Sequence, residues 1–145
     1  MTENLTQTPD WPGPVLNDLE WELFFDAPDD YWGIYEMADL PKRWQPSASD
    51  AEGRRMLVQA FRRLLELGLI YFCRAGETMF APNAVERRVS SEEAYRALAD
   101  DRSWEPPPSA DWHEDQRLCY TATTRGVELY YKTAENLAGE QSDHA

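Results

Sequence analysis

The chain has 145 residues, enough for one domain with a hydrophobic core and too few for two. A net charge of -13 is typical of disorder, but six Trp, seven Tyr and five Phe supply apolar surface for a core. No apolar run approaches the roughly 20 residues that span a bilayer, and no secretory signal precedes the body, so we expect a folded, cytoplasmic protein.

An irregular arm and a first helix are predicted at the N-terminus. Residues 1–14 contain three prolines and one aromatic side chain, Trp11, which can attach the arm to the body. Leu16, Leu19 and Leu23 then recur at helical spacing until Pro28, and this pattern predicts the first helix.

Two more helices are predicted before the first strand. Asp29 and Asp30 can cap a short second helix that ends at Pro41. Asp50 opens the longest helical pattern, over 51–67, and Gly68 ends it with the left-handed backbone that glycine favours. The inward faces of these elements predict a core of Leu19, Leu23, Ile34, Leu57, Phe61, Leu64, Ile70 and Phe72.

Strands and an insertion are predicted in the second half. Residues 69–74 favour a strand, and Gly76-Glu77 fits a two-residue turn into a return strand over 78–81. A last strand is expected over 118–123, and Thr124 can cap a closing helix. Residues 139–145 are expected to be a disordered tail.

The segment 82–117 is predicted to be an insertion between the strands. Ser90-x-x-Glu93 is a capping-box pattern for a short helix that ends near Asp100, and a proline-rich surface loop follows over 101–115. Because Trp104 and Trp112 are costly to expose, we expect the insertion to be an ordered cover docked on the body.

Two stretches resemble winged helix-turn-helix proteins of the MarR-like and PadR-like type. Leu64-Leu65-Glu66-Leu67-Gly68-Leu69-Ile70 is similar to the end of a recognition helix that runs into a wing strand. Tyr120-Thr121-Ala122-Thr123-Thr124-Arg125-Gly126 is similar to the return strand and the Thr-x-x-Gly entry into the next helix. The resemblance implies an α+β fold over 15–138, with three helices, a small antiparallel β wing enlarged by the insertion, and a C-terminal helix.

Residues that could support catalysis are few. His113 and His144 are the only histidines, and there is no HExxH motif, Cys-x-x-Cys pair or glycine-rich phosphate loop. Helix ends and helix caps explain Asp26, Asp29 and Asp30. Exposure to solvent explains the acidic residues of the loop 111–115. We therefore expect a protein without enzymatic activity, cofactor or metal.

Cys73 and Cys119 each lie in a strand-like stretch, where buried free thiols are expected. A redox pair formed by these two thiols requires that the two strands are neighbours in the sheet.

Charge is distributed unevenly along the chain. Residues 1–40 carry ten acidic and no basic residues, whereas 41–75 carry seven basic and three acidic ones. A DNA-binding transcriptional regulator would insert the third helix into the major groove, with Arg54 and Arg55 at base edges and the other basic side chains at phosphates. The candidate nucleic-acid-binding residues are Lys42, Arg43, Arg54, Arg55, Arg62 and Arg63.

The same charges support an alternative function. The net charge of -13 opposes DNA binding, and an acidic surface suits a basic partner protein that the chain would neutralise or connect to another. Arginine is also frequent at protein interfaces, and a solvated face paired with nearby acids is a third interpretation. DNA is the leading expectation and a protein partner the alternative, and a homodimer is left open.

Overall fold

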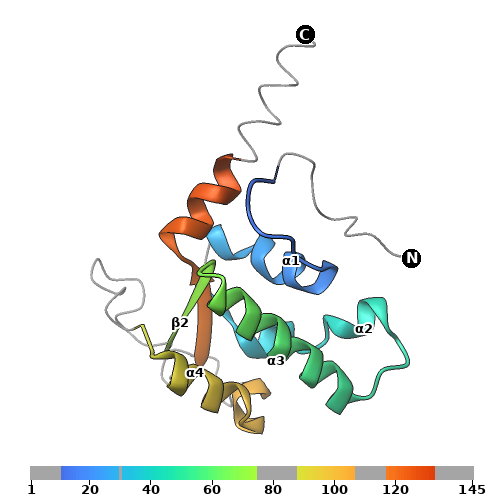
Figure 1. The fold of residues 1–145 in the computed structure, drawn as a ribbon. Coiled ribbons are helices and arrows are strands. Elements are labelled where there is room, and N and C mark those ends of the chain that lie inside the picture. The colour runs from blue at the N-terminus through green and yellow to red at the C-terminus, as the bar shows by residue number, and fades with distance from the viewer. Residues whose placement is uncertain (1–10, 30, 75–87, 107–116, 133–145) are drawn as a thin grey trace.

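The structure is a computed structural model that describes residues 11–29, 31–74, 88–106 and 117–132. It has an α+β fold in which helices pack around a small antiparallel sheet (Figure 1). The elements are α1 (Asp18–Phe25), η1 (Ala27–Asp29), β1 (Trp32–Gly33), η2 (Ile34–Met37), α2 (Pro41–Trp44), α3 (Asp50–Glu66), β2 (Ile70–Arg74), α4 (Ser91–Leu98), η4 (Asp101–Trp104), β3 (Leu118–Ala122) and a closing helix over 124–132.

The first helix is confirmed, and the arm before it is attached as expected through Trp11. The Trp11 indole is buried and meets Trp21 edge-on, with 5.1 Å between the ring centroids. Asn17 and Glu20 form a capping box at the start of α1, in which each side chain accepts a hydrogen bond from the other residue's backbone N–H. The chain therefore enters α1 in a defined direction.

The second helix predicted between Asp29 and Pro41 is wrong. The chain forms the short strand β1 and the 3-10 turn η2 there, and helix α2 begins at Pro41 where the sequence had predicted an end. Trp32 is drawn into the sheet because it pairs with Tyr120 of β3, and this tertiary pairing overrides the local helical pattern. Proline suits the first position of a helix because the N–H that it lacks has no partner there.

Helix α3 confirms the longest helical pattern. Ser49 caps its N-terminus by accepting a hydrogen bond from the Glu52 backbone N–H. Gly68 follows its end with a φ of 75°, a left-handed conformation that other residues rarely adopt. The turn at Gly68 leads directly into β2.

The sheet has the order β1-β3-β2, with β3 in the centre and antiparallel to both neighbours. The antiparallel pairing of β2 with β3 confirms the small antiparallel sheet that the sequence predicted. Val89 extends the outer edge of β2, since its N–H donates to the Phe72 carbonyl at 2.9 Å. The return strand expected over 78–81 lies outside the described residues.

Aromatic side chains form the centre of the core between α3 and the sheet. Phe61 of α3 contacts Tyr120 of β3 with ring centroids 4.8 Å apart, and Phe72 of β2 at 5.7 Å. The Tyr120 hydroxyl donates to the Leu23 carbonyl at 2.7 Å, which links α1 to the same core. All eight predicted core residues are buried.

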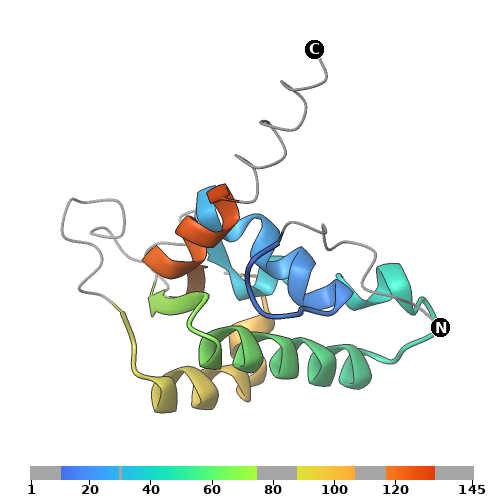
Figure 2. The ribbon, with the colours of Figure 1, turned by 45° about the horizontal axis from the view of Figure 1, so that its top comes forward.

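The insertion covers α3, as expected for its described part. Helix α4 runs beside α3 on the side away from α1 (Figures 1 and 2). Trp104 is only 4% exposed, and its indole N–H donates to the Leu98 carbonyl at 2.9 Å. The prediction of a loop over 101–115 is wrong for its first four residues. Asp101–Trp104 form a 3-10 turn, and this turn places the Trp104 indole in the core. Trp112 lies outside the described residues.

The closing helix is capped by Thr123 and not, as predicted, by Thr124. The Thr123 hydroxyl accepts from the Gly126 N–H at 3.0 Å and donates to the Gly68 carbonyl at 2.6 Å. A Cβ at position 126 would lie 2.4 Å from the Leu69 carbonyl oxygen, so the close approach requires glycine there. No helix in the described part of the chain is both long and apolar enough to cross a membrane.

Phe61→Ala should lower the free energy of unfolding by about 3–5 kcal/mol, because it leaves a cavity between α3 and the sheet. Urea denaturation followed by tryptophan fluorescence measures the change. Phe25→Ala is the matched control, since Phe25 is 46% exposed, and it should cost less than about 1 kcal/mol. Equal costs for the two variants would contradict the assigned core.

Tyr120→Phe tests the buried hydroxyl and its response to pH. Burial, with smaller contributions from nearby carboxylates, raises the Tyr120 pKa far above its usual value. The folded state therefore keeps a proton that the unfolded chain loses above about pH 10, and stability falls as the pH rises past that point. Tyr120→Phe should cost about 1–2 kcal/mol at pH 7, and this difference from the native chain should narrow above pH 10.

Candidate functional site

The basic residues singled out from the sequence are mostly engaged by the chain itself. Lys42 pairs with Asp50 at 2.8 Å, and Arg43 of α2 pairs with Glu22 of α1 at 3.3 Å. These pairs are exposed at the surface and contribute little to stability. They nevertheless place a carboxylate beside each basic group.

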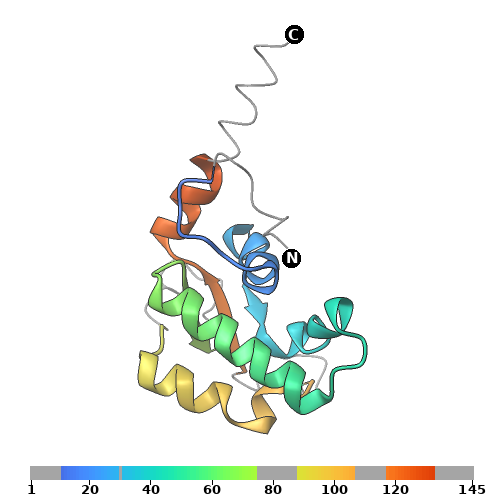
Figure 3. The same cartoon turned by 45° about the vertical axis from the view of Figure 1, so that its right-hand side comes forward.

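The insertion engages two arginines of α3. Arg54 pairs with Asp101 at 2.8 Å, and its guanidinium lies 5.1 Å from the Trp104 ring. Arg62 lies over the Tyr95 ring of α4 at 4.3 Å. The side of α3 that carries these two arginines therefore holds α4 and η4 in place (Figure 3).

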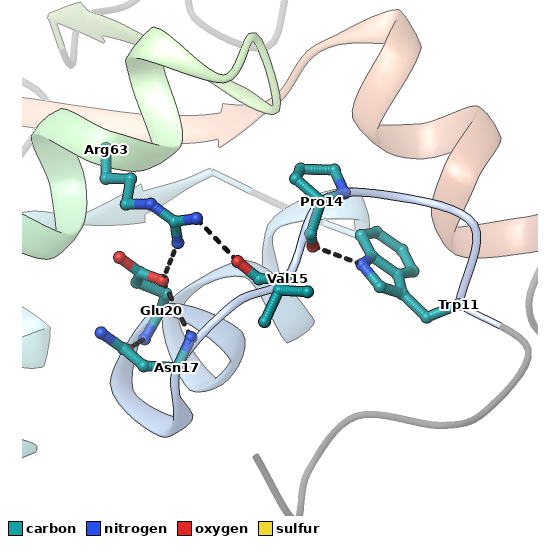
Figure 4. Close-up of polar contacts among 6 residues, drawn as sticks. All are labelled: Trp11, Pro14, Val15, Asn17, Glu20 and Arg63. Carbon is teal, nitrogen blue, oxygen red and sulfur yellow. Dashed lines mark hydrogen bonds and ion pairs between the residues drawn. The ribbon is translucent and has the colours of Figure 1, made fainter. Parts of the chain in front are cut away.

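Arg63 connects α3 to the N-terminal arm (Figure 4). Its guanidinium forms an ion pair with Glu20 of α1, whose side chain is 3% exposed. It also donates to the Val15 carbonyl at 2.7 Å. Glu20 in turn accepts from the Asn17 N–H, so the capping box and the ion pair share one carboxylate. The Trp11 indole closes the arm by donating to the Pro14 carbonyl at 2.8 Å.

The first turn of α3 is acidic. In a helix that reads DNA, residues near the N-terminus contact base edges between the phosphates. Asp50 and Glu52 occupy the first turn here, and both are exposed. Among the six candidate basic residues, Arg55 is the one for which the described structure shows no hydrogen bond, ion pair or ring contact.

A groove between α1, α2 and α3 has a volume of about 690 Å³. Leu19 of α1 and Met56 and Ala60 of α3 supply apolar lining. Asp18 and the Glu20–Arg63 pair line the polar side. Trp44 of α2 also lines the groove and is 40% exposed.

The sequence reasoning missed Trp44 and the groove. Trp44 directly follows Lys42 and Arg43, and only these two basic residues were predicted there as site residues. The groove itself depends on the packing of three helices, of which α2 was not predicted at its true position.

Acidic residues dominate the segment from α1 to η2. The described residues 11–40 carry seven acidic side chains and no basic one, whereas the described residues after position 40 carry nine acidic and thirteen basic ones. Asp26 and Asp39 are both exposed. We call the acidic side chains of this segment that are at least partly exposed, Asp18, Glu22, Asp26, Glu36 and Asp39, the acidic surface.

The two cysteines face each other across β2 and β3. Cys73 is directly opposite Cys119 in the register, and neither forms a disulfide. The Thr123 N–H donates to Leu69 at the other end of this ladder, which makes positions 69, 71 and 73 hydrogen-bonded ones. Facing Cα atoms at such positions lie about 5.5 Å apart with roughly parallel Cβ bonds, whereas a disulfide prefers Cβ atoms about 3.8 Å apart. The strands are neighbours, but this register disfavours a redox pair.

Within the described residues, no three His, Cys, Asp or Glu side chains are grouped so that they could hold a metal ion. His113 and His144 lie outside those residues. No protein-family model, curated protein or solved structure matches the chain. The groove and the distribution of charge are therefore the features that indicate a function.

Arg63→Ala should lower the free energy of unfolding by about 1–3 kcal/mol, because it leaves the buried Glu20 carboxylate without its cation. The expected cost stays below that of a fully buried pair because Arg63 is 44% exposed. Arg55→Ala, on the same helix, should change stability by less than about 0.5 kcal/mol. Chemical denaturation of both variants measures the difference, and equal effects would contradict the structural role of Arg63.

Proposed function

We propose that the chain is a non-enzymatic protein-interaction module that binds a basic partner protein through the acidic surface. The observation that carries this proposal is the separation of charge, with every basic side chain of the described residues lying after position 40. A surface of one sign attracts a partner of the opposite sign and accelerates its association.

The scaffold proposed for this module is a winged helix. Its support is the order of the elements, in which α1, β1, α2 and α3 are followed by the antiparallel pair β2 and β3. The turn at Gly68 and the Thr123 cap lie at the two stretches that carry the resemblance. A scaffold of this kind does not decide the function, which depends on the surface that it presents.

The contacts of the basic residues favour a protein partner over DNA. Affinity for DNA comes largely from cations that contact phosphates. In this chain Arg54, Arg62 and Arg63 hold the insertion and the arm, and Asp50 and Glu52 lie where base contacts would be made. DNA binding stays a hypothesis that the same experiment tests.

Neutralising the acidic surface should weaken capture of the partner. Asp26→Asn with Asp39→Asn removes two exposed charges of that surface, and Glu66→Gln with Glu105→Gln removes two exposed charges elsewhere. We expect proteins captured from a nuclease-treated extract of the native host to be basic, to be retained by the control pair, and to associate about three to ten times more slowly with the acidic-surface variant. Quantitative mass spectrometry and surface plasmon resonance measure these effects.

A DNA arm of the experiment separates the two functions. A labelled random duplex of about 20 base pairs at low salt should not bind, even though electrostatic attraction is then least screened. Duplex binding that Arg55→Glu abolishes would favour the DNA-binding regulator. Equal capture by both neutralised pairs would remove the acidic surface from the proposal.

A further inference from the structure

We propose that Cys73 and Cys119 form a binding site for one cuprous ion, Cu(I), which lies between their two thiolates. The sheet presents both thiols on one face, because residues directly paired in an antiparallel ladder point to the same side. The site is independent of the acidic surface, and it departs from the sequence expectation of a protein without a metal.

The thiols belong to a row of paired residues that crosses the sheet. Arg88 pairs with Cys73 at the outer edge of β2, and Cys73 pairs with Cys119 of β3. Cys119 pairs in turn with Gly33 of β1, where the row ends. A Cβ at Gly33 would lie 2.6 Å from the Tyr35 ring, so this ring occupies the space beside Cys119 that a larger residue would fill.

The spacing of the two thiols suits a bridging ion better than a disulfide. At a hydrogen-bonded pair the Cα atoms are about 5.5 Å apart and the Cβ bonds are roughly parallel, whereas an S–S bond is about 2 Å long. A metal–thiolate bond of about 2.3 Å on each side of an ion places the sulfur atoms about 4.6 Å apart. Small rotations about the Cα–Cβ bonds supply that separation, whereas a disulfide requires the strands to approach each other.

The number of ligands selects a soft monovalent ion. Structural zinc takes four ligands, and within the described residues no third His, Cys, Asp or Glu joins the two thiols. Cu(I) prefers thiolates and is stable with two of them in line. Cys73 is 1% exposed and Cys119 is 0% exposed, and Tyr31 and Tyr71 pack with them in a cluster apart from the main core. Such a dry site keeps water away from the ion.

Two arginines offset the charge of the bound ion. One Cu(I) with two thiolates carries one net negative charge, which is costly to bury unless a cation lies nearby. Arg88 faces Cys73 in the register, and its guanidinium lies 3.8 Å from the centroid of the Tyr71 ring, on the same face of β2. Arg117 precedes Cys119 by two residues, and its Nε is buried without a hydrogen-bond partner among the described residues. Positive charge therefore flanks the thiols on both strands.

Binding exchanges two protons for one ion. Each thiol releases its proton to solvent as its sulfur bonds to Cu(I), and no electron is transferred. The thiols lie one pair from the end of the ladder, which is formed by Arg74 and Leu118. Because strand ends open more readily than strand centres, opening of this last pair gives the ion a route to the thiols.

Anaerobic titration with Cu(I), in competition with a chromogenic chelator of known affinity, tests the site. The full chain with reduced thiols should retain one ion per chain, and X-ray absorption should show two sulfur neighbours. Cys73→Ala and Cys119→Ala should each lower the affinity at least about 100-fold, because each removes one of two ligands. Thr121→Ser is the matched control, since Thr121 is buried and lies next to Cys119 on the same face of β3, and it should change the affinity less than about threefold.

The other outcomes would overturn the site. These are loss of all Cu(I) to the chelator, equal retention by either alanine variant, one ion per two chains, and Zn²⁺ bound as tightly as Cu(I). Circular dichroism verifies the fold of each variant. If an alanine variant does not fold, the native chain still decides, because Cu(I) should raise its unfolding temperature and show two sulfur neighbours. Absence of either result would contradict the proposal.

Discussion

The contact between Phe61 and Tyr120 organises the whole structure. It joins the middle of α3 to the central strand of the sheet, with ring centroids 4.8 Å apart. The Tyr120 hydroxyl donates to the Leu23 carbonyl of α1, and Trp104 of the insertion packs against Phe61 with ring centroids 6.1 Å apart. Because aromatic rings bury large areas, this cluster compensates for the low aliphatic content of the chain.

The arginines of α3 illustrate how one side chain can serve the fold in place of a ligand. Arg54 and Arg62 engage η4 and α4, and Arg63 engages α1 and the arm. Releasing them to phosphate would mean exchanging these contacts for new ones, and Arg63 would leave a buried carboxylate behind. The position of the charges in space therefore carries more information about function than their number.

The acidic surface has a long-range role in the proposed interaction. Charge acts over about 10 Å at ordinary salt and sets the rate of encounter. Burial of an apolar side chain acts at contact and sets the lifetime of the complex.

The elements that depend on local signals could be predicted from the sequence. The Ser90 cap of α4, the glycine at position 68 and the apolar face through Leu57, Phe61 and Leu64 were all predicted from spacing and residue type, whereas the cap of α3 is Ser49 and not the expected Asp50. The pairing of Trp32 and the contacts of the arginines depend on the tertiary structure. Trp32 joined a strand because β3 offered it hydrogen bonds, and the arginines lost their free face because the insertion folded against them. Such pairings join residues far apart in the chain, and local propensity cannot rank them because their energies come from packing and desolvation, which exist only once the chain is compact.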